Sequence, residues 1–304
     1  MLYSHVVIKM KNKLSGSLAL LLATVIWGSA FIAQSVGMDH IGPMTFQAAR
    51  CGLGGVFLVP VIFLFEKDKK QYLRNWINPK LWKTGFFCGC ALFMAAGLQQ
   101  VGLVYTTAGK AGFITAMYIV LVPILGLFLK RRPPVSAWIS VLVAVAGLYL
   151  LSCVGASEIN LGDILMLGGA LGFAVQITLV DEMAGELDGL RLNCIQAFVC
   201  SVFSAVVMFL TETPTFSGIA AAAIPIGYAG IFSMGIAYSL QIVGQKHLEP
   251  TPASLIMSLE SVFAALCGWL LLHEQMTPAE LCGCALVFGA VIISQLPEKQ
   301  KTHG

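Results

Sequence analysis

Long apolar runs, separated by short polar segments, make up almost the whole chain of 304 residues. Each run is close to the roughly 20 residues that cross the hydrocarbon layer of a bilayer as a helix. The runs do not alternate polar and apolar positions, as the strands of a membrane barrel do. The pattern therefore predicts ten membrane-spanning helices, at residues 14–36, 43–65, 83–104, 109–130, 135–154, 161–181, 191–210, 221–245, 251–272 and 278–296.

The composition places these helices in lipid and not in a soluble core. Hydrophobic residues make up 58% of the chain and charged residues only 11%, whereas soluble domains carry about 25% charged residues. The first run follows Lys9, Lys11 and Lys13, as the apolar core of a signal peptide would. It is longer than the roughly 7–15 residues of a cleavable signal. We therefore expect an all-α integral membrane protein that retains its first span.

Basic residues mark the orientation of the spans. If the N-terminus is cytoplasmic, 16 of the 18 Lys and Arg residues fall on the cytoplasmic side, leaving Arg50 inside the second span and Lys110 at the outer mouth of the fourth. This asymmetry is what the positive-inside rule predicts. We expect a multi-pass protein of the plasma membrane with both termini in the cytoplasm. The net charge of +3 then reports topology, and we expect no nucleic-acid partner.

The chain also repeats itself once. Residues 99–152 and 241–294 align at a constant offset of 142, with 12 identities in 54 positions, Gln99/Gln241 among them. Ten spans divide into five per half, and an odd number of spans inverts the second half relative to the first. We expect two inverted five-helix repeats, at residues 1–154 and 155–304. Binding sites in such proteins lie near the bilayer midplane, between the repeats.

Ionisable residues at membrane depth are costly and normally face protein or a watery cavity. Glu260 lies in the middle of the ninth run. Two interpretations are open for its carboxyl group. It either binds a cationic or amine group or carries a coupling proton, or it accepts hydrogen bonds that fix helix packing. Arg50 can snorkel outward or pair with a carboxylate such as Glu260, and we favour a structural or gating role for it. Lys110 is expected to be a solvated end residue.

Glutamine and aromatic side chains inside the spans complete the candidate set. A two-fold axis would place the repeat mates Gln99 and Gln241 symmetrically, where their amides can hold a polar or zwitterionic solute or merely bond neighbouring helices. Tyr118 is the repeat mate of Glu260. Pro123 can kink the fourth span, as a gating hinge or as a matter of shape. The candidate substrate-binding residues are Trp27, Phe31, Gln99, Tyr118, Gln176, Tyr238, Gln241 and Glu260.

The sequence carries no catalytic or metal-binding pattern. It has no phosphate-binding glycine loop and no zinc spacing. The cysteine pairs Cys88/Cys90 and Cys282/Cys284 are two residues apart, so on a helix their side chains point in roughly opposite directions. We therefore expect no enzyme, no cofactor and no metal site.

Four short motifs resemble the drug/metabolite transporter superfamily, specifically the EamA-type permeases. They are Trp27-Gly28-Ser29-Ala30-Phe31 in the first span, Arg50 in the second, residues 109–123 ending at a proline, and residues 258–265 followed by Gly268 and His273-Glu274. The resemblance implies ten helices in two inverted repeats, around a central cavity lined largely by spans one, three, four, six, eight and nine. It also implies export of amino acids and other small metabolites.

The chain departs from the family pattern at two places. Ser261 replaces the usual proline after Glu260, which predicts a weaker helix break there. Residues 130–132 are basic where the first repeat usually ends in an acidic motif, so the acidic end is kept only at Glu274, a candidate structural or gating residue.

These observations favour a secondary transporter that moves small organic metabolites, such as amino acids or drug-like solutes, outward by alternating access around a midplane cavity. Its partners would be the solute, the lipid bilayer and a coupling proton carried by Glu260. A non-transporting membrane scaffold, a lipid-handling protein and an integral-membrane enzyme are the alternatives.

Overall fold

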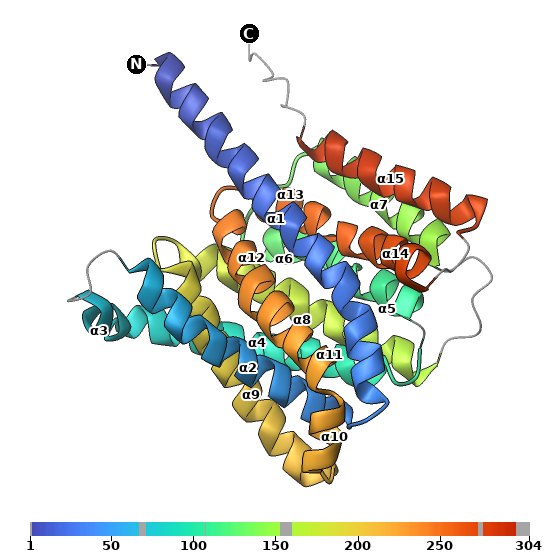
Figure 1. Ribbon diagram of the computed structural model, residues 1–304. Coiled ribbons are helices and arrows are strands. Elements are labelled where there is room, and N and C mark those ends of the chain that lie inside the picture. The colour runs from blue at the N-terminus through green and yellow to red at the C-terminus, as the bar shows by residue number, and fades with distance from the viewer. Residues whose placement is uncertain (1, 67–70, 107, 153–159, 273–275, 296–304) are drawn as a thin grey trace.

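The computed structural model describes residues 2–66, 71–106, 108–152, 160–272 and 276–295, and these form a bundle of helices (Figure 1). The first half contains α1 (Leu2–Met38), α2 (Pro43–Phe65), α3 (Gln71–Trp76), α4 (Pro79–Gly102), α5 (Ala108–Thr115), α6 (Tyr118–Phe128) and α7 (Val135–Ser152). The second half contains α8 (Leu161–Ala184), α9 (Gly189–Thr211), α10 (Phe216–Ala221), α11 (Ala223–Tyr228), the π-helix η1 (Ala229–Ala237), α12 (Tyr238–Gln245), α13 (Pro250–Met257), α14 (Leu259–Leu272) and α15 (Pro278–Gln295).

The predicted spans are confirmed. The described residues contain nine helical segments long and apolar enough to cross a membrane, and a shorter apolar helix at Val135–Leu151. Spans four, eight and nine are each built from more than one helical element, α5–α6, α11–η1–α12 and α13–α14. The other spans are single helices, so each predicted run corresponds to one span.

Local sequence signals set where several helices begin. Pro43 and Pro79 occupy the first turns of α2 and α4, where a missing backbone N–H costs nothing. The side chain of Asn160 accepts a hydrogen bond from the backbone N–H of Asp163, whose carboxylate in turn accepts one from Asn160, and this capping box starts α8.

Equivalent spans of the two halves pack against each other. Span two (α2) packs along span seven (α9), and span five (α7) lies side by side with span ten (α15) (Figure 1). Span one contacts span nine through α1 and α14, and span six contacts span four through α8 and α6. Pairing of equivalent helices is what a two-fold axis between the repeats produces.

Glycines allow some of these helices to approach closely. A Cβ atom built on Gly28 of α1 would lie 2.6 Å from the Cβ atom of Phe263 and 2.7 Å from the backbone nitrogen of Ala264, both on α14. The glycine of the Trp27–Phe31 motif therefore allows the first span to pack directly against the backbone of the ninth.

Spans four and nine are interrupted at equivalent positions. Span four breaks between α5 and α6, at Ala116 and Met117, and span nine breaks between α13 and α14, at Ser258. Ala116 and Ser258 are related by the offset of 142 residues. Pro123 lies inside α6 and not at the break, and its repeat mate is Ala265. The second break therefore forms without a proline, although Ser261 stands where the family pattern has one.

The prediction that Lys110 is a solvated end residue is wrong. Its ammonium lies 2.6 Å from Asp163 Oδ2, and the two side chains are only 12% and 7% exposed. Thr106 also donates a hydrogen bond to Asp163. The physical reason is that Asp163 is buried as part of the capping box of α8, and a buried carboxylate is stabilised by a nearby cation. The pair joins the first repeat, through α5, to the second, through α8.

Removing this cation is expected to destabilise the protein. Lys110→Met leaves the buried Asp163 carboxylate without its ion-pair partner and should cost about 3 kcal/mol of unfolding free energy. Thermal unfolding in detergent should show a lowered midpoint for Lys110→Met and an unchanged one for Lys83→Met, since Lys83 is exposed. Equal midpoints in the two variants would contradict the structural importance of the pair.

Ion pairs also join the repeats at the opposite end of the bundle. Arg131, just after α6, pairs with Asp181, at 2.5 Å, and with Glu182, both on α8. Arg191 of α9 pairs with Glu66, at the end of α2. Charged contacts therefore join the two halves at both ends of the bundle.

Candidate functional site

A cavity lies at the centre of the bundle, beside the two helix breaks. Its volume is about 40 Å³, well below the roughly 300–1,000 Å³ that is usual for small-molecule sites. The residues that line it come from spans one, three, four, six, eight and nine, as the family resemblance implies, with Arg50 added from span two. They are Trp27, Phe31, Gln34, Arg50, Gln99, Thr115, Tyr118, Phe173, Ile177, Ser233, Tyr238, Gln241, Met257 and Glu260.

The structure brings most of the candidate substrate-binding residues together here. Trp27, Phe31, Gln99, Tyr118, Tyr238, Gln241 and Glu260 all line the cavity. Gln176 does not line it but lies behind Gln241, whose Nε2 donates to Gln176 Oε1 at 3.0 Å. Of the candidate gating residues, Arg50 borders the cavity, Pro123 is buried in α6 outside it, and Glu274 lies outside the described residues.

Other lining residues were not among the candidates. Gln34 lies seven positions after Trp27 and three after Phe31, so its place on the same face of α1 follows from helical spacing. Thr115 and Met257 each end the helix that precedes a break, which the sequence pattern does not mark. Phe173, Ile177 and Ser233 also line the cavity and looked like ordinary helix-packing residues.

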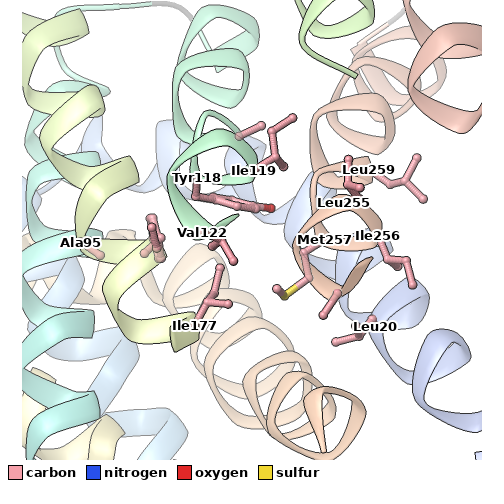
Figure 2. Close-up of a cluster of buried hydrophobic side chains, with 14 of the residues drawn as sticks. Leu20, Ala95, Tyr118, Ile119, Val122, Ile177, Leu255, Ile256, Met257 and Leu259 are labelled. Carbon is pink, nitrogen blue, oxygen red and sulfur yellow. The ribbon is translucent and has the colours of Figure 1, made fainter. Parts of the chain in front are cut away.

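The two helix breaks meet at Tyr118 and Glu260. Tyr118 begins α6, directly after the first break, and Glu260 is the second residue of α14, directly after the other. The Tyr118 hydroxyl donates to Glu260 Oε1 at 3.2 Å, and both side chains are buried. Tyr118 points across toward the segment that carries Leu255 and Met257 (Figure 2). The repeat mates therefore contact each other, and the positive end of α14 lies close to the Glu260 carboxylate.

Arg50 and Glu260 border the same cavity without pairing, so the interaction suggested by the sequence is not formed. Arg50 Nε donates to Gln47 Oε1 at 2.7 Å, and the side chain is 3% exposed. Within the part of the chain that the structure describes, neither residue has a group of opposite charge within 4.0 Å. The cavity thus holds one guanidinium group and one carboxyl group that do not form an ion pair with each other.

Aromatic rings and unmatched polar atoms form the rest of the lining. The rings of Trp27 and Tyr238 meet edge to face with centroids 5.0 Å apart. Among the described residues, Trp27 Nε1, Gln34 Oε1 and Gln241 Oε1 are buried and have no hydrogen-bond partner. Since buried polar atoms are normally paired, these three mark places where a solute or water would be bound.

Comparison with known proteins agrees with this architecture. Residues 14–153 and 160–295 each match the model of the EamA-like transporter family. An uncharacterized transporter of Archaeoglobus fulgidus is 33% identical over 94% of this chain and 87% of its own length. The threonine/homoserine exporter RhtA of Escherichia coli K12 is 27% identical over 89% of this chain and 86% of its own length. The uncharacterized inner membrane transporter YedA of the same strain is 25% identical over 91% of this chain and 90% of its own length.

A solved crystal structure has the same fold. It superposes with a TM-score of 0.77 and covers 92% of this chain and 96% of its own, at 17% sequence identity. The family model spans both halves of the chain, and the helices, the two-fold pairing and the central cavity are those expected of a ten-span transporter. The chain belongs to the EamA-like transporter family.

Proposed function

We propose that the protein is a secondary transporter that exports small organic metabolites, and that zwitterionic amino acids are the solute class that best matches the charged groups of its cavity. The observation that carries this proposal is the presence of Arg50 and Glu260 on one cavity without an ion pair between them. An amino acid offers a carboxylate to Arg50 and an ammonium group to Glu260, and charge-assisted bonds to both would neutralise both. That a relative is a threonine/homoserine exporter supports the same solute class.

Alternating access would follow from the contacts that join the repeats. The Lys110–Asp163 pair lies at one end of the bundle, and the Arg131 and Arg191 pairs lie at the other. Rocking one repeat against the other would open one set while the other stays closed. With the termini in the cytoplasm, as the basic residues favour, the Arg131 and Arg191 pairs form the cytoplasmic gate.

Counterflow in proteoliposomes tests the solute class. Proteoliposomes that contain the wild-type protein and are loaded with L-threonine or L-homoserine should exchange the radiolabelled amino acid. The matching amine without a carboxylate and the matching acid without an amine should exchange poorly. Exchange of the amine or the acid as fast as the amino acid would contradict a zwitterion site.

The variant Arg50→Met should raise the KM for the amino acid about tenfold, because a hydrogen bond to a charged group contributes roughly 1.5–3 kcal/mol. Arg50→Lys should recover part of that loss, because the charge stays while the second donor is lost. Arg74→Met removes an exposed arginine of α3 and serves as the control. A KM unchanged in Arg50→Met would remove this residue from the site.

A further inference from the structure

A row of four buried amides runs from the cavity across spans eight, six and seven. Gln241 Nε2 donates to Gln176 Oε1 at 3.0 Å, Gln176 Nε2 to Gln196 Oε1 at 3.3 Å, and Gln196 Nε2 to Asn193 Oδ1 at 2.8 Å. All four side chains are at most 2% exposed. We call Gln241, Gln176, Gln196 and Asn193 the amide chain; only Gln241 among them lines the cavity.

The far end of the amide chain meets the π-helical turn. Where η1 gives way to α12, the backbone bonding returns from a five-residue to a four-residue spacing, so one carbonyl is bypassed by the helix ladder. Asn193 Nδ2 donates to the backbone carbonyls of Met234, at 2.8 Å, and Gly235, at 3.1 Å, which lie at this point. Because a carbonyl oxygen can only accept, the amide nitrogen of Asn193 must face these groups.

That constraint passes along the whole amide chain. Because the Asn193 nitrogen donates to the backbone, the Asn193 oxygen faces Gln196. Gln196 must therefore donate a hydrogen bond to it from its amide nitrogen. In the same way, the Gln196 oxygen accepts a hydrogen bond from the Gln176 nitrogen, and the Gln176 oxygen accepts one from the Gln241 nitrogen. Turning any single amide would set two oxygens or two nitrogens against each other. The orientation of each amide, usually an open choice between oxygen and nitrogen, is therefore fixed by the π-helical turn.

The consequence reaches the cavity at Gln241. Its nitrogen is committed to Gln176, and Gln241 Oε1 is buried without a partner among the described residues. Gln34 ends in the same state, because its Nε2 donates to the carbonyl of Ala30, at 3.2 Å, and its Oε1 is unpaired. Both glutamines line the cavity, and both present an acceptor.

We infer that the amide chain holds Gln241 as a hydrogen-bond acceptor toward the solute, so that the transported molecule must place an N–H or O–H donor there. Asn193, Gln196 and Gln176 are then positioning residues that set solute specificity without touching the solute. The inference rests on the proposed function, because the donor belongs to the transported solute. It adds a requirement that charge alone does not impose, since Arg50 and Glu260 would accept zwitterions with or without such a donor.

Breaking the amide chain away from the cavity tests the inference. Gln196→Leu leaves the amides of Gln176 and Gln241 free to turn together, and Gln100→Leu is the matched control, because Gln100 is an equally buried glutamine outside both the amide chain and the cavity lining. The probe is L-homoserine counterflow in proteoliposomes. The competitors are the analogue with fluorine in place of the hydroxyl and the N-trimethyl analogue, each of which lacks one kind of donor.

In wild type and in Gln100→Leu, at least one analogue should compete about tenfold less well than L-homoserine, the usual consequence of one buried acceptor left unpaired. In Gln196→Leu that difference should fall below about threefold, because Gln241 can then turn its nitrogen to the solute. A loss of transport that is equal for all three compounds would mean a purely structural role and would overturn the inference. A wild type that does not exchange L-homoserine would instead refute the proposed function.

Gln176→Leu breaks the amide chain one link nearer the cavity and should give the same loss of discrimination if Gln196→Leu does not fold. A wild-type structure with L-homoserine bound makes the test without any variant. A solute nitrogen or hydroxyl should lie about 3 Å from Gln241 Oε1. A solute carboxylate oxygen at that distance would overturn the inference.

Discussion

Glu260→Gln is expected to lower amino acid flux by about 100-fold, because losing one partner of a buried charge pair costs roughly 2–5 kcal/mol. The carboxylate is 6% exposed, lies on the cavity, and receives a hydrogen bond from Tyr118. The described residues supply no cation within 4.0 Å. A buried carboxylate with no cation is stabilised only when a ligand or a proton neutralises it. Glutamine keeps the shape and the hydrogen bond but removes the charge.

Flux in proteoliposomes measures this effect against two reference variants. Glu249→Gln removes an exposed carboxylate at the start of the same span and should leave the flux unchanged. Tyr118→Phe removes only the neutral partner, so its flux should fall about fivefold, in line with one hydrogen bond. If Glu260→Gln transports as well as Glu249→Gln, the carboxylate has no part in solute binding.

The same variant decides whether Glu260 carries the coupling proton. If it does, an imposed pH gradient should drive wild-type accumulation and have no effect on the residual flux of Glu260→Gln, since glutamine cannot exchange a proton. An equal response to the gradient in both proteins would exclude Glu260 as the carrier while leaving its role in binding intact.

The repeat explains why much of the cavity could be predicted from the sequence. Run length alone gives the spans, because the bilayer fixes how long an apolar helix must be. The offset of 142 residues then pairs Tyr118 with Glu260, and in an inverted repeat equivalent positions near the axis approach each other. The contact between these two residues is therefore a direct result of the symmetry.

Other parts of the site depend on tertiary contacts that leave no periodic trace. The break at Ser258 has no proline, and the π-helical turn at Ala229–Ala237 looks like any apolar helix in the sequence. The role of Asn193 could not be predicted from the sequence, because it depends on hydrogen bonds to two backbone carbonyls of span eight. The burial of Lys110 could not be predicted for the same reason, since its partner Asp163 is 53 residues away along the chain.

Gly283→Ala is expected to destabilise the protein by about 2–3 kcal/mol, because small-to-large changes in packed regions cost this much when the neighbours cannot move. A Cβ atom on Gly283 would lie 2.5 Å from the carbonyl oxygen of Gly147 and 2.7 Å from the backbone nitrogen of Leu151. These are backbone atoms of α7, the helix that lies beside α15 in Figure 1. Relief therefore requires the two helices to separate.

Gly289→Ala supplies the matched control on the same helix. A Cβ atom at Gly289 meets nothing within 4 Å, and alanine favours a helix over glycine by about 1 kcal/mol. Thermal unfolding in detergent should therefore show a raised midpoint for Gly289→Ala and a lowered one for Gly283→Ala. Equal midpoints would mean that α7 and α15 are not held in backbone contact.

The two glycine variants also separate stability from transport. No residue of α7 or α15 is among those that line the cavity. Folded Gly283→Ala protein should therefore keep the wild-type KM for the amino acid while its unfolding midpoint falls, the reverse of the pattern expected for Arg50→Met. A raised KM in Gly283→Ala would show that the contact between spans five and ten shapes the cavity from outside it.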